Sequence, residues 1–304
     1  MTALPVSAVG VKVPASTANL GSGFDALGMA LSLHDTVSVQ VVDGPPGSAQ
    51  VRVEGEGAGS IPTDERHLVV RVLHKTLAEL GFPAPALRLH CENSIPHARG
   101  LGSSAAAIVA GVAAGFGLAG IDLRDKGNAD RALDVAAARE GHADNAAASL
   151  LGGVVVAWQE CGRFRAVRMR PHPDVSPVVL VPQAQSSTDA TRGLLPERVP
   201  HADAAFAAGR AALAVHAVTR APELLLAATD DRLHQDYREA AWPDTIALVR
   251  QLREAGVAAA VSGAGPTVLA LPVGGGLPAG IAPNGFRVLH LPVDDAGVRI
   301  TAQA

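Results

Sequence analysis

The chain has 304 residues, of which 58 are Ala and 32 Gly, against 6 Phe, 2 Trp and 1 Tyr. Because 48% of the residues are apolar, the chain can bury enough surface to offset the entropy of folding, and intrinsic disorder is excluded. The net charge of −4 gives no bulk attraction to nucleic acids or anionic membranes, and the length favours about two domains.

The first half of the chain predicts strands and helices in an irregular alternation. In chain order we expect a strand at residues 9–15, a glycine-rich loop at 16–28, a strand pair at 31–42, a strand at 51–53, a helix at 64–80, a strand at 86–91, helices at 103–117 and 129–138, and a strand at 152–158. In the first of these helices Leu73, Leu77 and Leu80 share one apolar stripe, which Gly81 closes.

A cluster of three prolines at positions 171, 173 and 177 predicts a linker, so we divide the chain into domains of residues 1–168 and 169–304. In the second domain we expect a strand at residues 178–181, helices at 204–218, 222–229 and 243–254, and strands at 257–261, 267–271 and 286–291. Because neither half has a strict βαβ rhythm, the fold class predicted is α+β.

The cysteine pattern and the N-terminus both favour a cytoplasmic protein. Cys91 and Cys161 form no C-x-x-C motif or disulfide framework, and the first residues lack the features of a signal peptide. The uncharged run at residues 100–121 is long enough for a membrane span. However, it contains six Gly and begins with Gly-Leu-Gly-Ser-Ser, which favours a buried helix behind a glycine loop.

That glycine loop is the strongest local signal, because it follows a predicted strand and precedes a predicted helix. It comprises Pro96, His97, Ala98, Arg99, Gly100, Leu101, Gly102, Ser103, Ser104, Ala105 and Ala106. The two glycines allow the backbone to approach a ligand, and the N-terminus of the helix attracts an anion such as a phosphate. The alternative is a Ser-capped helix with a tight turn before it. No lysine follows in the G-x-x-x-x-G-K-[ST] pattern, so the ordinary P-loop is excluded.

This loop resembles the ATP-binding motif of the GHMP small-molecule kinases. Residues 13–28 resemble the first motif of the family in its homoserine-phosphorylating form, and residues 261–267 resemble the third. The three motifs occur in the family's order over nearly the whole chain. Ser22 and Ala143 replace prolines often found in the motifs, at positions that need no functional side chain.

The resemblance implies a two-domain fold, with an N-terminal domain like ribosomal protein S5 domain 2 and a ferredoxin-like C-terminal domain. It also implies ATP-dependent phosphorylation of the side-chain hydroxyl of L-homoserine to O-phospho-L-homoserine, with Mg²⁺, in threonine biosynthesis. A kinase of another small alcohol and a nucleotide-sensing regulator without turnover are the rival interpretations. We expect no nucleic-acid or membrane partner. The sequence leaves open a homodimer, feedback inhibition and the contacts of the adenine ring.

Two residues are candidates for binding the metal. Mg²⁺ prefers carboxylate and hydroxyl oxygens, which Glu140 and Ser104 offer, and the resemblance implies the same pair. A surface Glu at a helix end is the alternative interpretation.

The first glycine loop carries the candidates for the amino-acid substrate. Asp25 can accept hydrogen bonds from an ammonium group and a hydroxyl, and Asn19 can orient the hydroxyl. An Asx turn is the alternative for both residues. The family pattern also places His142 and Asn145 at the substrate.

The substrate carboxylate calls for arginine. The resemblance implies that Arg192 and Arg238 hold it, although without the family each would be assigned to the solvated surface. The backbone at Gly263 is expected to line the site, the alternative being a plain hairpin turn.

Some family members have Asp at the position of Asn145, which cannot accept a proton. Asp25 is the only carboxylate that we place at the hydroxyl, and Asp144 is expected to point elsewhere. We therefore predict catalysis by Asn145, Glu140 and Asp25 through positioning and charge, without a strong general base.

Overall fold

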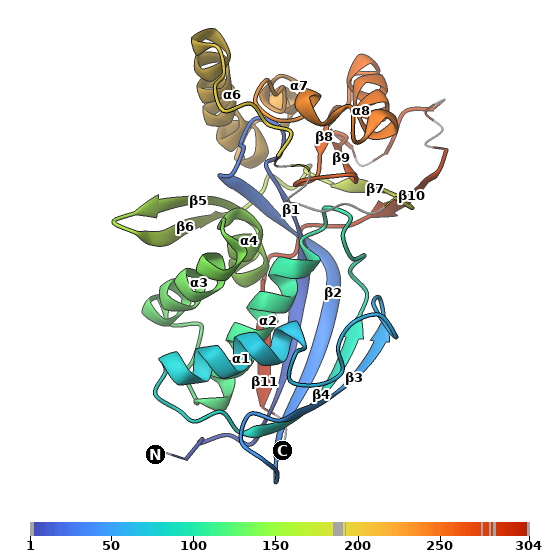
Figure 1. Ribbon diagram of the computed structural model, residues 1–304. Helices are drawn as coiled ribbons and strands as arrows, with labels where there is room; N and C mark the ends of the chain where they lie inside the picture. Colours follow the sequence, from blue (N-terminus) through green and yellow to red (C-terminus); the bar gives the residue numbers. More distant parts are fainter. Residues whose placement is uncertain are drawn as a thin grey trace.

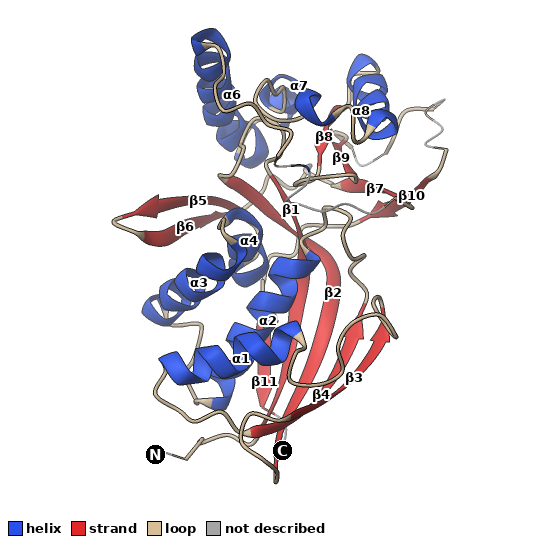
Figure 2. Ribbon diagram, viewed as in Figure 1, coloured by secondary structure: helices blue, strands red, loops and turns tan. Residues whose placement is uncertain are grey.

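The computed structural model describes residues 3–184, 191, 193–274, 276–279, 281 and 284–302. One mixed sheet and one antiparallel sheet form its framework, and helices cover one face of each (Figures 1 and 2). The predicted α+β architecture is confirmed.

The first sheet has a long central strand that joins its two parts. Its strands are β1 (Ala8–Ala18), β2 (Leu27–Val42), β3 (Ala49–Gly55), β4 (Ala86–Asn93), β5 (Val154–Glu160), β6 (Arg163–Met169) and β11 (Arg299–Ala302). The order is β11-β1-β2-β4-β3, and β5 pairs with the beginning of β2 and with β6. The strand pair expected at residues 31–42 is therefore one continuous strand that begins at Leu27.

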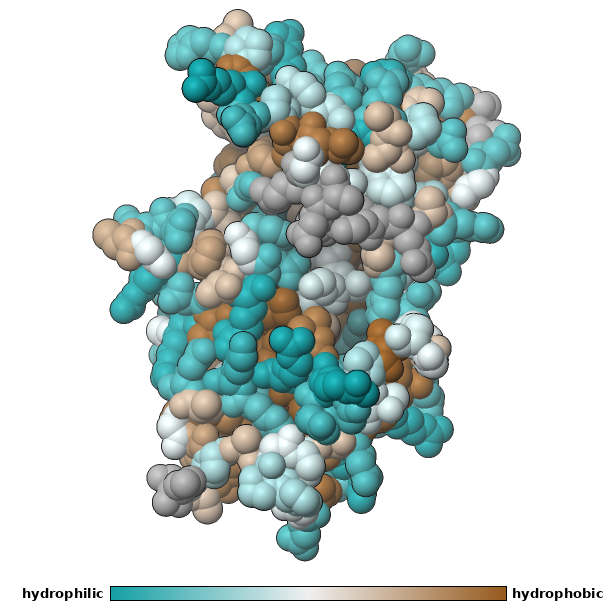
Figure 3. Space-filling model, viewed as in Figure 1, coloured by the Kyte–Doolittle hydropathy of each residue, from teal (hydrophilic) through white to brown (hydrophobic). Residues whose placement is uncertain are grey.

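Four helices cover this sheet: α1 (Leu68–Glu79), α2 (Ser103–Leu118), α3 (Lys126–Glu140) and α4 (Asp144–Leu151). Buried residues lie all around α2, which packs against α1, α3, α4 and β1. A Cβ atom at Gly111 would lie 2.8 Å from the Val69 carbonyl oxygen, so this glycine lets α1 and α2 approach closely. On the face of the molecule that α1 and α3 form, most of the side chains in view are hydrophilic (Figure 3). In the part of the chain described, no helix has the length and apolarity required to cross a bilayer.

The second sheet is antiparallel and has the order β10-β7-β9-β8. Its strands are β7 (Val178–Pro182), β8 (Ala258–Val261), β9 (Val268–Leu271) and β10 (Phe286–His290). The helical segments of this half are α6 (His201–Thr219), η1 (Pro222–Leu224), α7 (Leu225–Ala228), η2 (Asp236–Arg238) and α8 (Pro243–Glu254). The first and third strands of this half lie at the centre of the sheet, which fits the expected ferredoxin-like arrangement.

The end of the chain returns to the first sheet, where β11 pairs antiparallel with β1. Asp294, just before that strand, contacts His34 of β2 at 2.6 Å. The division of the chain at residues 168 and 169 stays a prediction, but the last strand packs with the first half. Strands β6 and β11 and helix α4 are not predicted from the sequence.

Candidate functional site

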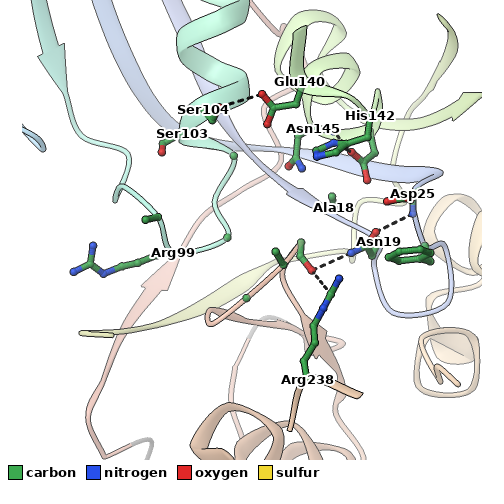
Figure 4. Close-up of a pocket in the computed structure, with 18 residues that line it drawn as sticks. Ala18, Asn19, Asp25, Arg99, Ser103, Ser104, Glu140, His142, Asn145 and Arg238 are labelled. Carbon is green, nitrogen blue, oxygen red and sulfur yellow. Dashed lines mark hydrogen bonds and ion pairs between the residues drawn. The ribbon is translucent and has the colours of Figure 1, made fainter. Parts of the chain in front are cut away.

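Three segments that are far apart in the sequence meet at the end of β1. The Gly263 N–H donates a hydrogen bond to the Ala18 carbonyl at 3.2 Å. The Ser262 hydroxyl lies 2.6 Å from the Gly100 carbonyl oxygen, to which it donates, and 2.8 Å from the Thr17 hydroxyl. These contacts join the three motifs around a pocket of about 250 Å³, whose lining residues Figure 4 shows.

The glycine loop leads directly into α2, and Gly102 is the residue before its first turn. Gly100 has a φ of +78°, and a Cβ atom there would overlap the Ser262 carbonyl oxygen. Glycine is therefore needed at this position so that the third motif can pack against the second. The N–H groups of the first turn of α2 and the hydroxyls of Ser103 and Ser104 form the polar end of the helix.

The eleven residues predicted for the loop divide into three groups. Those that line the pocket are Ala98, Arg99, Gly100, Gly102, Ser103 and Ser104. Pro96, Leu101, Ala105 and Ala106 are buried and line neither this pocket nor the second cavity described below. His97 lines the second cavity only.

Arg99 has its guanidinium directed away from Glu140 and Ser104 (Figure 4). It donates to the carbonyl oxygens of His97, Pro182 and Gln183 at 2.9–3.1 Å. Its side chain therefore fastens the glycine loop to the end of β7.

Glu140 is the last residue of α3, and its Oε2 accepts a hydrogen bond from Ser104 Oγ at 3.1 Å. Burial raises the pKa of the Glu140 carboxyl, an effect that the charge of His142 and the Ser104 hydrogen bond partly offset. Among the described residues, no Lys or Arg forms an ion pair with Glu140. A half-buried carboxylate beside a hydroxyl is a donor set that suits Mg²⁺, so these two residues fit the ion that the family implies.

The loop between β1 and β2 is held in an unusual backbone conformation. Asn19, Leu20, Gly21 and Asp25 have φ values of +71°, +47°, +81° and +55°. Asn and Asp tolerate this left-handed region better than Leu, which is held there by its burial. Strain of this kind persists where the surroundings over-determine the backbone, as they often do at binding sites.

Asn19 connects the first motif to the third. Its Oδ1 accepts a hydrogen bond from the Asp25 N–H, and its Nδ2 donates to the Gly263 carbonyl oxygen, both at 3.0 Å (Figure 4). This contact spans six residues and so is not an Asx turn, in which the side-chain oxygen accepts from the N–H two residues further on. The Asn19 amide has one further N–H with which to meet a ligand. Asp25 lines the same pocket.

Asn145 lies in the first turn of α4, and its Oδ1 accepts a hydrogen bond from Ser16 Oγ at 3.0 Å. With that oxygen engaged, the amide has Nδ2 as its donor toward a ligand. Asp144 also lines the pocket, contrary to expectation, and its Oδ1 lies 3.0 Å from His142 Nδ1 and accepts from the Asn145 N–H at 2.7 Å. Both residues reach the site because the helix begins there.

Arg238 enters the pocket from the second half of the chain and is 2% exposed. Its Nη1 donates to the Gly263 carbonyl oxygen at 3.1 Å and lies 3.0 Å from Nδ1 of His234. The ring of Phe24, which also lines the pocket, stacks on His234 at 5.1 Å between centroids. Arg192, the other predicted carboxylate ligand, lies outside the described residues.

A second cavity of about 320 Å³ lies on the other side of the α2 N-terminus and shares Ser103 and Ser104 with the first. Most of its lining is apolar: Val13, Val37, Ile61, Pro62, Leu68, Val69, Ala107 and Ala110. His67 also lines it and is 4% exposed, and among the described residues neither of its ring nitrogens has a hydrogen-bond partner. Neither His67 nor His234 is predicted from the sequence, because neither lies in a pattern that distinguishes it from a structural histidine.

Comparison with known proteins gives consistent results. The family model described as GHMP kinases N terminal domain matches residues 67–153, and the GHMP kinases C terminal model matches residues 210–272. The homoserine kinase of Streptomyces coelicolor is 51% identical over 88% of this chain and 86% of its own length. That of Mycolicibacterium smegmatis is 50% identical over 96% of this chain and 94% of its own length.

Solved structures share the whole architecture. A homoserine kinase from Cytophaga hutchinsonii superposes with a TM-score of 0.81 at 23% identity, covering 99% of both chains. A putative homoserine kinase from Listeria monocytogenes gives a TM-score of 0.75 at 28% identity, over 97% of this chain and 100% of its own.

Proposed function

Since the chain belongs to the homoserine kinases of the GHMP kinase family, we propose that it transfers the γ-phosphoryl group of ATP to the side-chain hydroxyl of L-homoserine. The products are O-phospho-L-homoserine and ADP, and the reaction belongs to threonine biosynthesis. The observation that carries the proposal is the lining of the main pocket. Asp25 and Arg238 share it with the first turn of α2, so groups for an ammonium, a carboxylate and a phosphate surround one space.

The two cavities on either side of Ser103 and Ser104 suit the two substrates. The apolar cavity fits a purine ring, and a neutral His67 has one donor and one acceptor for the edge of the base. Burial lowers the pKa of His67, and the charge of His97 lowers it further, which keeps the ring neutral. The triphosphate then lies along the α2 N-terminus, with its γ-phosphate at the entrance of the main pocket.

The substrate amino acid is held by opposite charges. The Arg238 guanidinium binds the carboxylate, and the Asp25 carboxylate binds the ammonium and orients the hydroxyl. Asn145 directs an amide N–H at the transferring phosphoryl group. Because a loose transition state requires little prior deprotonation, the hydroxyl proton can leave late, to phosphate or water.

The charge on the nucleotide requires a cation. Ser104 and Glu140 would hold Mg²⁺, which neutralises phosphate charge when it is bound. The Ser104–Glu140 hydrogen bond keeps the two ligand side chains together in the substrate-free protein.

The proposal is tested by measuring ADP release with L-homoserine, D-galactose and mevalonate as acceptors, and without an acceptor. We expect ADP to form at a substantial rate only with L-homoserine. Preference for either of the other two alcohols would reject the assignment of substrate. A rate independent of every acceptor would reject kinase activity on these alcohols.

A further inference from the structure

His234 lies behind the main pocket and contacts both the loop between β1 and β2 and the side chain of Arg238. Its Nε2 is 2.8 Å from the carbonyl oxygen of Gly21, in the loop that carries Asp25. Its Nδ1 is 3.0 Å from Nη1 of Arg238. The side chain is 0% exposed, so these contacts are shielded from water.

The two contacts determine the protonation state of the ring. A carbonyl oxygen only accepts, so Nε2 must carry the hydrogen that is donated to Gly21. The Arg238 guanidinium only donates, so Nδ1 must be the acceptor. His234 is therefore the neutral Nε2–H tautomer. A proton on Nδ1 would remove the acceptor and place two cations together.

The surroundings of the ring support this assignment. Burial is the main cause that lowers the pKa of His234. The Asp231 carboxylate, 3.7 Å from Nε2, raises it, as do the hydrogen bond to Gly21 and the charge of Asp25, whereas the charge of Arg238 lowers it further. The Asp231 carboxylate accepts the backbone N–H groups of residues 233, 234 and 235, which fixes the backbone on which the ring is mounted. The ring of Phe24 covers one face of the imidazole.

We infer that His234 is a positioning residue, which as a neutral Nε2–H imidazole holds the Arg238 guanidinium and the Gly21 loop in register for the two charged groups of the amino-acid substrate. The inference rests on the proposed function for its choice of substrate. The imidazole lines neither the second cavity nor the glycine loop, so we expect its effect to fall on the binding of the amino-acid substrate.

Two substitutions separate the contacts. In His234→Gln the side-chain amide nitrogen can replace Nε2 and keep the Gly21 contact, but the acceptor for Arg238 is lost. In His234→Asn the amide oxygen can replace Nδ1 and keep the Arg238 contact, but the donor to Gly21 is lost. Both variants are polar and smaller than His, so both lose packing contacts of the ring. A difference between their kinetic constants therefore reports mainly on the two hydrogen bonds.

The kinetic readout uses two competitive inhibitors, 4-hydroxybutyrate, which lacks the ammonium group, and 3-aminopropan-1-ol, which lacks the carboxylate. For His234→Gln we expect about a tenfold rise in the L-homoserine KM and in the 4-hydroxybutyrate inhibition constant. The 3-aminopropan-1-ol constant and the ATP KM should change less than twofold. For His234→Asn the larger effect should fall on 3-aminopropan-1-ol. Equal effects of both variants on both inhibitors, or a parallel rise in the ATP KM, would indicate a merely structural role and overturn the inference.

A second measurement does not depend on turnover. A long-range ¹H–¹⁵N spectrum of the histidine rings, with His234 assigned by its absence in His234→Gln, should show the neutral Nε2–H pattern in the substrate-free protein at pH 6. An imidazolium or an Nδ1–H tautomer would overturn the inference even if the wild type proved inactive on homoserine. Inactive wild type with the expected tautomer would reject the proposed function alone.

Discussion

The Ser104 hydroxyl donates a hydrogen bond to Glu140 Oε2 over 3.1 Å, which joins the first turn of α2 to the last residue of α3. The donor lies in the predicted phosphate loop, and the acceptor is 36 residues further along the chain. This contact brings the expected metal ligands together in the lining of the pocket that Asp25 and Arg238 also line.

Glu140→Gln should lower activity and raise stability. A neutral amide lacks the negative charge that attracts a divalent cation, so we expect kcat to fall by about 100-fold. The folded state raises the pKa of this carboxyl above its ordinary value of 4.5, so the stability linked to its protonated form is lost as the pH rises through the folded-state pKa. The variant should therefore be more stable than the wild type at pH 7.5, an advantage that disappears near pH 4.

Steady-state kinetics and urea unfolding at the two pH values measure both effects. Glu239→Gln is the control, because Glu239 is an exposed carboxylate whose pKa is lowered by its hydrogen bond to Arg250. It should keep normal turnover and gain no stability at neutral pH. Wild-type turnover in Glu140→Gln would contradict the assignment of this residue to the metal site.

Asp25→Asn should weaken homoserine binding and lower kcat together, each by about tenfold, because the carboxylate serves both the ammonium and the hydroxyl. Initial rates over a range of L-homoserine concentrations separate the two parameters. A fall in kcat with unchanged homoserine affinity would show instead that Asp25 is a general base. Asp43→Asn, in the turn between β2 and β3, is a control that should behave as wild type.

Arg238→Lys should raise the L-homoserine KM by about 10- to 100-fold and leave the ATP KM unchanged. Lysine cannot form the planar pair of hydrogen bonds that a carboxylate accepts, and the contact with the Gly263 carbonyl is also lost. Arg253→Lys is a matched control, since Arg253 also donates to backbone carbonyls but does not line the pocket. A rise in the KM for both substrates would argue that Arg238 acts mainly on the fold.

His67→Leu should raise the ATP KM by about tenfold and reduce the preference for ATP over GTP, because the apolar side chain cannot form hydrogen bonds with the edge of the base. His67→Asn keeps a donor and an acceptor and should be less impaired. The comparison of kcat/KM for the two nucleotides measures the effect. His74→Leu, at a half-buried histidine of α1 that contacts the Pro85 carbonyl, controls for loss of a structural imidazole. An unchanged nucleotide preference in His67→Leu would contradict the placement of the adenine ring in the second cavity.

Gly111→Ala and Gly209→Ala should change stability in opposite directions. At Gly111 the new methyl group meets the Val69 carbonyl and the Val72 side chain at 2.8 Å, and such overpacking costs about 1–3 kcal/mol. At Gly209, in the middle of α6, an added Cβ atom would have no described atom within 4 Å outside the backbone of its own helix, so the better helix propensity of Ala should stabilise by up to about 1 kcal/mol. Urea unfolding measures both. A stabilising Gly111→Ala would show that α1 and α2 can separate without cost.

Local sequence patterns predicted most elements and the three motifs, because hydrophobic periodicity and glycine placement are local signals. They did not predict β6, whose arginines obscure its alternation, or β11, which has only four residues and pairs with a strand nearly 300 positions away. The burial of Ala105 and Ala106 explains why part of the predicted loop is core and not lining.

The site was predicted as a set of residues, but not as a set of contacts. The sequence predicts that Asn19 orients the substrate hydroxyl, yet its two side-chain hydrogen bonds hold the backbone of Asp25 and Gly263. His234 and His67 carry no sequence signal, because only the tertiary structure defines what distinguishes them. Both are buried, and the ring nitrogens of His234 have partners, whereas among the described residues those of His67 have none.

A ³¹P NMR spectrum of the complete reaction tests the proposed phosphoryl transfer most directly. With the protein, MgATP and L-homoserine, we expect one new phosphomonoester resonance that grows in step with ADP and is absent when L-homoserine is omitted. ADP accompanied only by inorganic phosphate, or a phosphomonoester that forms without L-homoserine, would contradict the proposed function.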